Sequence, residues 1–160
     1  MRFSAERLDR YALALATRLG AICADLDAEI PQMVEADDGQ VGLVIGGDLP
    51  GSPISARTRI ELVEHWAADG NAYRLIGYRY ELIDHENDRR RAFHRHDDAL
   101  FIRAFDVVVH EHCEEPIGVA RCAHVAGLPK RDGFEALNEL LAAWSTPPAD
   151  AICADLPCLD

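Results

Sequence analysis

The feature that most constrains the fold is a change in hydrophobic period, from a helical repeat at the start and end of the chain to a period of two in its middle. From residue 56 onward apolar residues such as Ile60 and Leu62 alternate with charged ones, a pattern typical of strands with one buried face. Turn-forming residues at Asp69–Asn71 and at 84–88 separate the first strand segments. Residues 56–126 are therefore predicted to form an antiparallel meander of about five strands. The predicted strands begin at residue 56 and continue over 73–82, with a bulge at Gly77, and then over 91–96, 105–113 and 117–125.

Two segments outside this region carry the helical period. Residues 4–28 have apolar side chains every three or four positions after Ser4, a plausible N-cap, and Gly133 opens a second such segment over 133–145. The glycine-rich and proline-rich residues 31–55 are predicted to be loop, with at most a short strand at Val41–Ile45. We expect one α+β domain over residues 1–148, in which an N-terminal and a C-terminal helix pack on a curved antiparallel sheet. Residues 149–160 are predicted to be a tail that is at most partly ordered.

Composition restricts the classes of function. The 160 residues carry a net charge of −12, from 16 basic and 28 acidic residues, which disfavours long-range attraction of nucleic acids or anionic membranes. No signal peptide and no uncharged run of membrane-spanning length are visible. The five cysteines have no framework spacing. These features predict a cytoplasmic protein that does not bind membranes.

Six of the histidines and cysteines between residues 94 and 124 fall in three pairs, and the two members of each pair are separated by one residue. Because alternate residues of a strand point to the same face, each pair is predicted to project from one side of the sheet. Neighbouring strands lie about 4.8 Å apart, so adjacent pairs on one face would meet. The intervening residues, such as Phe93 and Cys113, would then face the core. The pairs are His94 and His96, His110 and His112, and Cys122 and His124.

Three interpretations of this cluster remain open on residue chemistry alone. The first is a metal site for zinc or another divalent transition metal, since zinc prefers imidazole nitrogen and thiolate sulfur; it lacks the usual Cys-x-x-Cys or His-Glu-x-x-His spacing. The second is acid–base chemistry on a phosphodiester by paired imidazoles, for which histidine is suited near neutral pH. The third is a solvated polar face without function. The candidate metal ligands are His94, His96, Cys122 and His124, together with His110 and His112.

Acidic and basic residues near the cluster fit the acid–base interpretation. Arg95 or Arg103 could stabilise phosphate charge, and Asp97 or Asp98 could fix the tautomer of an imidazole. The run Arg89–Arg91 is the densest basic patch of the chain, although an exposed turn explains it somewhat better than a phosphate-binding role does.

The segment Arg95-His96-Asp97-Asp98-Ala99, followed by His110-Glu111-His112, resembles the TumE family of toxin–antitoxin proteins, with Asp98 where that family has asparagine. The similarity spans roughly residues 57–144. It implies a curved antiparallel sheet, a growth-inhibiting toxin acting on RNA, and a helix-turn-helix antitoxin as partner. The residues that inherit the suspected catalytic role by this resemblance are Arg95, Asp97, His110 and His112.

A protein-interaction module without catalysis is a further alternative. It would use the amphipathic helix predicted over residues 4–28, whose apolar stripe could also join two protomers in a homodimer. Base rates favour packing of this stripe on the protein's own sheet.

Overall fold

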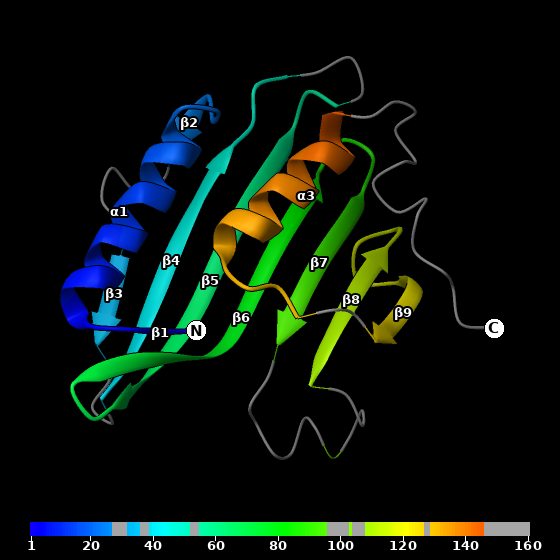
Figure 1. The fold of residues 1–160 in the computed structure, drawn as a ribbon. Coiled ribbons are helices and arrows are strands. Elements are labelled where there is room, and N and C mark those ends of the chain that lie inside the picture. The colour runs from blue at the N-terminus through cyan, green and yellow to red at the C-terminus, as the bar shows by residue number, and fades with distance from the viewer. Residues whose placement is uncertain are drawn as a thin grey trace.

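The fold is an antiparallel sheet with two helices on one face, in a computed structural model that describes residues 1–26, 32–35, 39–51, 55–95, 103, 108–126 and 129–145. Helices α1 (Ala5–Gly20) and α3 (Gly133–Ser145) both lie on the near face of the sheet in Figure 1. The predicted α+β class, with a meander sheet covered by an N-terminal and a C-terminal helix, is confirmed. The strands are β1 (Arg2–Phe3), β2 (Asp25–Leu26), β3 (Gln32–Glu35), β4 (Gln40–Asp48), β5 (Thr58–Asp69), β6 (Ala72–Asp84), β7 (Arg89–Arg95), β8 (Val109–Glu114) and β9 (Ala120–Ala126).

Strands β4 to β9 pair in chain order, each antiparallel to the next. The pairs β5–β6, β6–β7, β7–β8 and β8–β9 form the predicted five-strand meander. Strand β4 pairs with β5 along one edge and with β2 and β3 along the other edge. The short strand β1 pairs with β6. The order of the strands places β7, which carries His94, beside β8, which carries His110 and His112.

Helix α1 begins as predicted and ends earlier than predicted. Ser4 is the N-cap, and its side chain accepts a hydrogen bond from the backbone N–H of Arg7 at 3.4 Å. The apolar stripe packs on the protein's own sheet, with Leu15 and Leu19 fully buried. The helix ends at Gly20 instead of continuing to residue 28, because the chain turns there and pairs as β2 with the end of β4. Of the apolar residues beyond Gly20, Ile22 lies in the turn that follows the helix, and Leu26 belongs to β2.

Strand β4 replaces much of the loop predicted over residues 31–55, and it is longer than the short strand expected at Val41–Ile45. The glycines of β4 let neighbouring segments of the chain pack closely against the strand, and they are not a sign of a mobile loop. A Cβ atom on Gly47 would lie 2.5 Å from the carbonyl oxygen of Asp25 and 2.9 Å from the sulfur of Cys23. A Cβ atom on Gly46 would lie 3.1 Å from the carbonyl oxygen of Ile60. Glycine enrichment was therefore a signal of tight packing, which composition alone does not distinguish from a loop.

The predicted bulge is present beside Gly77. Trp66 and His65 on β5 pair with Leu75 and Gly77 on β6, so that the intervening Ile76 is the extra residue. The later strands differ from their predicted limits by a few residues, as strand ends usually do. β8 begins at residue 109, and the part of the predicted strand at 105–107 lies outside the described residues, as does the predicted tail at 149–160.

A buried carboxylate joins the two helices to the sheet. Glu64 on β5 is fully buried and accepts hydrogen bonds from the hydroxyls of Tyr11 (2.5 Å) and Tyr80 (2.7 Å) and from Nε1 of Trp66 (3.0 Å). The Tyr11 hydroxyl in turn accepts the backbone N–H of Gly133, at the start of α3, at 2.8 Å. Burial raises the pKa of Glu64, although the three donors act in the opposite direction. One polar cluster thus fixes α1, the sheet and α3 together.

Among the described residues, no helix is both long enough and apolar enough to cross a lipid bilayer.

Candidate functional site

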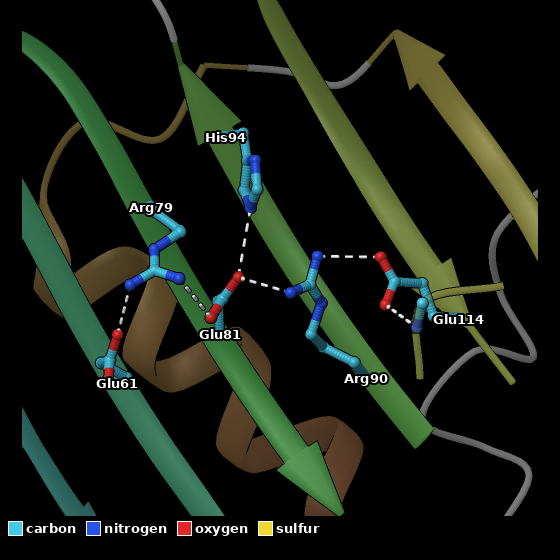
Figure 2. A network of polar contacts seen from close by, with 7 residues as sticks. Glu61, Arg79, Glu81, Arg90, His94 and Glu114 are labelled. Atoms are coloured by element: carbon cyan, nitrogen blue, oxygen red, sulfur yellow. Dashed lines mark hydrogen bonds and ion pairs between the residues drawn. The ribbon is translucent and has the colours of Figure 1, made fainter. Parts of the chain in front are cut away.

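The candidate site lies on the face of the sheet that is turned away from the two helices. Alternation along β7 produces this arrangement: Phe93 points into the core beneath the helices, and His94 points to the opposite face. Figure 2 shows the polar side chains of β5 to β8 on this face, with the helix behind the sheet. The sequence prediction that Phe93 and Cys113 face the core is confirmed, since both are buried in it.

The structure brings together two of the predicted histidines. His94 on β7 and His110 on β8 are direct partners in the antiparallel register, and their ring centroids lie 5.2 Å apart with an angle of 59° between the rings. The side chain of His94 is 12% exposed, whereas His110 is only 1% exposed. Only His94 of this pair therefore presents its ring to solvent. The convergence of histidines from neighbouring strands is confirmed for this pair.

Glu81 on β6 is the centre of the polar network in Figure 2. One of its oxygens, Oε1, lies 3.4 Å from Nε2 of His94 and 3.4 Å from Nη1 of Arg90, and Oε2 lies 3.2 Å from Nη1 of Arg79. The carboxylate is only 2% exposed, and this burial acts to raise its pKa. The hydrogen bond with His94 and the charges of Arg90 and Arg79 outweigh burial, so the pKa of Glu81 is below its ordinary value. Glu81 is therefore ionised at neutral pH and can hold an imidazole in position.

Each arginine of this network contacts a second carboxylate. Arg79 pairs with Glu61 on β5 at 2.5 Å, and Arg90 pairs with Glu114 on β8 at 2.8 Å. The other oxygen of Glu114 accepts the backbone N–H of Gly118 at 2.8 Å, which fixes that carboxylate. With three carboxylates for two guanidinium groups, the network has a net charge of about −1 when His94 is neutral.

A second ionic cluster lies on the opposite face, beneath α3. Arg91 is 6% exposed and contacts Glu139 at 3.3 Å and Glu111 at 3.8 Å, and Lys130 contacts Glu139 at 2.6 Å. The run Arg89–Arg91 is thus part of β7, with its charges paired on both faces of the sheet. The interpretation of this run as an exposed turn is wrong, because the turn ends one residue earlier, at Asp88.

The remaining predicted site residues are placed only in part. Arg95 follows His94 on β7, and alternation directs it to the helix-covered side of the sheet, where it lines a pocket with Lys130. The structure therefore does not place Arg95 with the histidine pair. His96 and Asp97 lie outside the described residues. The backbones of His112, Cys122 and His124 belong to β8 and β9, but the description does not extend to their side chains.

Metal binding receives no support from the described part of the chain. There, no group of three or more histidine, cysteine, aspartate or glutamate side chains is arranged to hold a metal ion.

Cys113 is disulfide-bonded, a state that the cysteine spacing had not indicated.

Sequence reasoning missed Glu81 and its two arginines. A signal for them was present, because Arg79 and Glu81 alternate with the apolar Tyr80 and Leu82 in a predicted strand. Residue type alone points to histidine and cysteine, whereas the face that a strand residue occupies also points to Glu81.

Comparison with known proteins adds no identification. The chain matches no protein-family model, no curated protein and no solved structure.

Proposed function

We propose that this protein is a TumE-like toxin that cleaves RNA by acid–base catalysis at the histidine pair. The observation that carries the proposal is the set formed by Glu81, His94 and His110: a buried carboxylate beside one imidazole, with a second imidazole 5.2 Å from the first. A carboxylate that orients a histidine is a recurrent device for general acid–base catalysis. The curved antiparallel meander also agrees with the fold that the TumE resemblance implies.

His94 is the residue assigned to proton transfer with the substrate, because its ring is the more exposed of the two. An Nε2–H bonded to Glu81 leaves Nδ1 with the lone pair that accepts a proton. In the proposed step this nitrogen takes the proton of a ribose 2′-hydroxyl, and the 2′-oxygen attacks the adjacent phosphorus. The bond from phosphorus to the 5′-oxygen breaks, and that oxygen takes a proton from a general acid. The products are a 2′,3′-cyclic phosphate and a free 5′-hydroxyl.

His110 acts on His94 as a positioning residue. Its buried ring lies 5.2 Å from the ring of His94, centroid to centroid, and limits the orientations that the His94 ring can adopt. The resemblance assigns Asp97 and His112 to the same chemistry, and one of these is the proposed general acid.

The test is expression of the full chain in a bacterial host without any antitoxin, followed by incubation of the purified protein with a synthetic RNA. We expect growth arrest, and cleavage that leaves 2′,3′-cyclic phosphate ends in the presence of EDTA. His94→Ala should abolish both, since general acid–base catalysis contributes about 10²–10⁴-fold. Glu81→Gln should retain cleavage with a changed pH profile, because the imidazole loses its charged partner.

The matched control is His65→Ala. His65 is an exposed histidine on β5, outside the Glu81 network, and its loss should leave arrest and cleavage unchanged. A wild-type chain that is harmless and leaves RNA intact would refute the proposal. Cleavage that EDTA abolishes would instead support the metal-dependent alternative, with zinc or another divalent transition metal at the histidine and cysteine pairs.

A further inference from the structure

The buried Cys113 is disulfide-bonded, and the pairing of β8 with β9 points to its partner. Cys113 on β8 lies directly opposite Cys122 on β9 in the antiparallel register. Directly opposite residues of such a pair share a face of the sheet and have Cα atoms about 4.5–5.5 Å apart. This separation falls within the roughly 4.4–6.8 Å that a disulfide requires. Cys23 is a free thiol beside β4, so it is not the partner.

A link between these two cysteines closes a loop that contains the turn between β8 and β9. Within this loop the backbone N–H of Gly118 donates to Oε2 of Glu114 at 2.8 Å, and Oε1 of Glu114 accepts from Nη2 of Arg90 at 2.8 Å. Arg90 also contacts Glu81, the carboxylate beside His94 (Figure 2). A change in the turn is therefore transmitted to the candidate site through a short series of direct contacts.

Backbone pairing between β8 and β9 is irregular beside the two cysteines. The register shifts on both sides of the Cys113–Cys122 pair, between Glu111 and Cys113 and again between Cys113 and Glu114. Each such irregularity interrupts the ladder of backbone hydrogen bonds. β9 ends the strand order, and among the described strands only β8 pairs with it. A covalent link at this point therefore contributes a large share of what holds β9 to the sheet.

We propose that Cys113 and Cys122 form a disulfide that acts as a redox switch on the histidine site. The inference rests on the proposed RNA cleavage: the oxidised protein cleaves RNA, and reduction lowers the rate because the loosened turn no longer fixes Glu114. The two cysteines are thus positioning residues. In a cytoplasmic protein, which the sequence predicts, a disulfide is usually redox-sensing or catalytic. In the oxidised state Cys122 has no thiolate to offer a metal ion.

The switch operates by thiol–disulfide exchange with a dithiol. One thiolate of the dithiol attacks a sulfur of the Cys113–Cys122 bond, which breaks and leaves a mixed disulfide. The second thiolate then attacks the mixed disulfide, so that an S–S bond forms within the dithiol, and two electrons and two protons pass to the cysteine pair. Oxidised glutathione reverses the reaction and leaves as two molecules of glutathione. Because Cys113 is fully buried, the attack requires local opening of β9.

Peptide mapping of the full chain tests the pairing. After alkylation of free thiols, trypsin cleaves at Arg103, Arg121 and Lys130, so that Cys113 lies in peptide 104–121 and Cys122 in peptide 122–130. We expect mass spectrometry to find these two peptides linked without reductant and separate after dithiothreitol. A free Cys113 thiol, or a link from peptide 104–121 to any other peptide, would overturn the proposal.

RNA cleavage and amide hydrogen exchange test the switch. Dithiothreitol should lower the cleavage rate by roughly tenfold or more, a part of the about 10²–10⁴-fold that acid–base catalysis contributes, and oxidised glutathione should restore it. The Gly118 amide should exchange faster after reduction, whereas the Gly133 amide, which donates to Tyr11, should not change. Equal cleavage in both redox states, unchanged Gly118 exchange, or loss of the folded circular dichroism spectrum on reduction would refute the switch.

Two variants separate the switch from other effects of reductant. Cys113→Ala combined with Cys122→Ala should cleave RNA at the reduced rate and should not respond to dithiothreitol; a full rate in this double variant would contradict the proposal. The matched control Cys23→Ala removes the free thiol and should respond like the wild type. Linked peptides and redox-dependent Gly118 exchange without RNA cleavage would refute the proposed function alone and support redox control of the polar network. Unlinked peptides from a protein that cleaves RNA would refute the switch alone.

Discussion

Replacement of Tyr11 by phenylalanine tests the polar cluster that joins the two helices to the sheet. The ring would remain packed in the core while two hydrogen bonds are lost: the one that the hydroxyl donates to Glu64 and the one that it accepts from the backbone N–H of Gly133. Glu64 is fully buried, so water cannot replace the missing donor. The free energy of unfolding should therefore fall.

The two losses have separable magnitudes. A hydrogen bond to a charged group contributes about 1.5–3 kcal/mol, and a buried N–H left without an acceptor costs about 1–3 kcal/mol. Tyr11→Phe should thus destabilise the protein by roughly 2.5–6 kcal/mol, a large part of the ~5–15 kcal/mol by which most domains are stable. Tyr80→Phe removes a donor to the same oxygen of Glu64 and leaves the Gly133 bond intact. It should cost less, by about the 1–3 kcal/mol of the orphaned N–H.

Urea unfolding at pH 7, followed by far-ultraviolet circular dichroism, measures both variants. With a slope of about 2 kcal/mol per molar urea, the loss in Tyr11→Phe should lower the midpoint by roughly 1–3 M. If Tyr11→Phe lies within about 0.5 kcal/mol of the wild type, below the range of lost buried hydrogen bonds, the cluster does not hold the helices. Equal losses in the two variants would show that the Gly133 bond contributes nothing.

Three further outcomes follow from other contacts. Because the pKa of Glu64 is raised, the folded protein keeps the proton on this carboxyl to higher pH than the unfolded chain does. The contribution of Glu64 to stability is therefore complete below its unfolded pKa and is lost as the pH rises through its folded pKa. Glu64→Gln should remove this decline in urea titrations across pH 4–8. Glu81 has a lowered pKa, so its carboxylate stabilises the fold at any pH above its unfolded pKa. Glu81→Gln should lower the free energy of unfolding by about 1–3 kcal/mol at pH 7, and this loss should shrink as the pH falls through the folded pKa. An equal loss at pH 7 and at pH 3 would contradict this expectation. Gly47→Ala should cost about 1–3 kcal/mol in thermal unfolding because its Cβ would collide with the carbonyl of Asp25, whereas Gly51→Ala, whose nearest neighbour would be 3.7 Å away, should be nearly neutral.

Local pattern was sufficient to predict most of the fold. The alternation after residue 56 gave the meander, and the turn at Asp69–Asn71 and the bulge beside Gly77 followed from residue type. The end of α1 was not predictable in this way, because Ile22 and Cys23 continue the helical spacing and only pairing of β2 with β4 shows that the chain has left the helix. β4 was underestimated for a related reason: its glycines are explained by backbone atoms from segments distant in sequence.

The sequence predicted where the candidate site lies on the sheet, but it predicted only some of the residues that form the site. Strand alternation placed His94 and His110 on one face of the sheet. This prediction required only that the strands carrying the two histidines be neighbours. The same alternation separates Arg95 from them, a consequence that the family resemblance obscured because it groups residues by motif. Glu81 entered the site through the register between β6 and β7, which pairs Arg79 with His94 and sets the neighbouring Glu81 opposite Ala92. Such a register is a property of the assembled sheet.

The Tyr11 hydroxyl also has a consequence for the order of folding. Its two hydrogen bonds span 53 and 122 residues of sequence, to Glu64 and Gly133. During synthesis the N-terminal helix precedes Gly133 by on the order of ten seconds at ribosomal rates. Over that interval the hydroxyl has no native N–H to accept, and α1 can pack on the emerging strands without being fixed there. Docking of α3 is therefore a late, non-local event, and a ribosome-bound chain that ends before residue 133 should remain open to proteases that the complete protein resists.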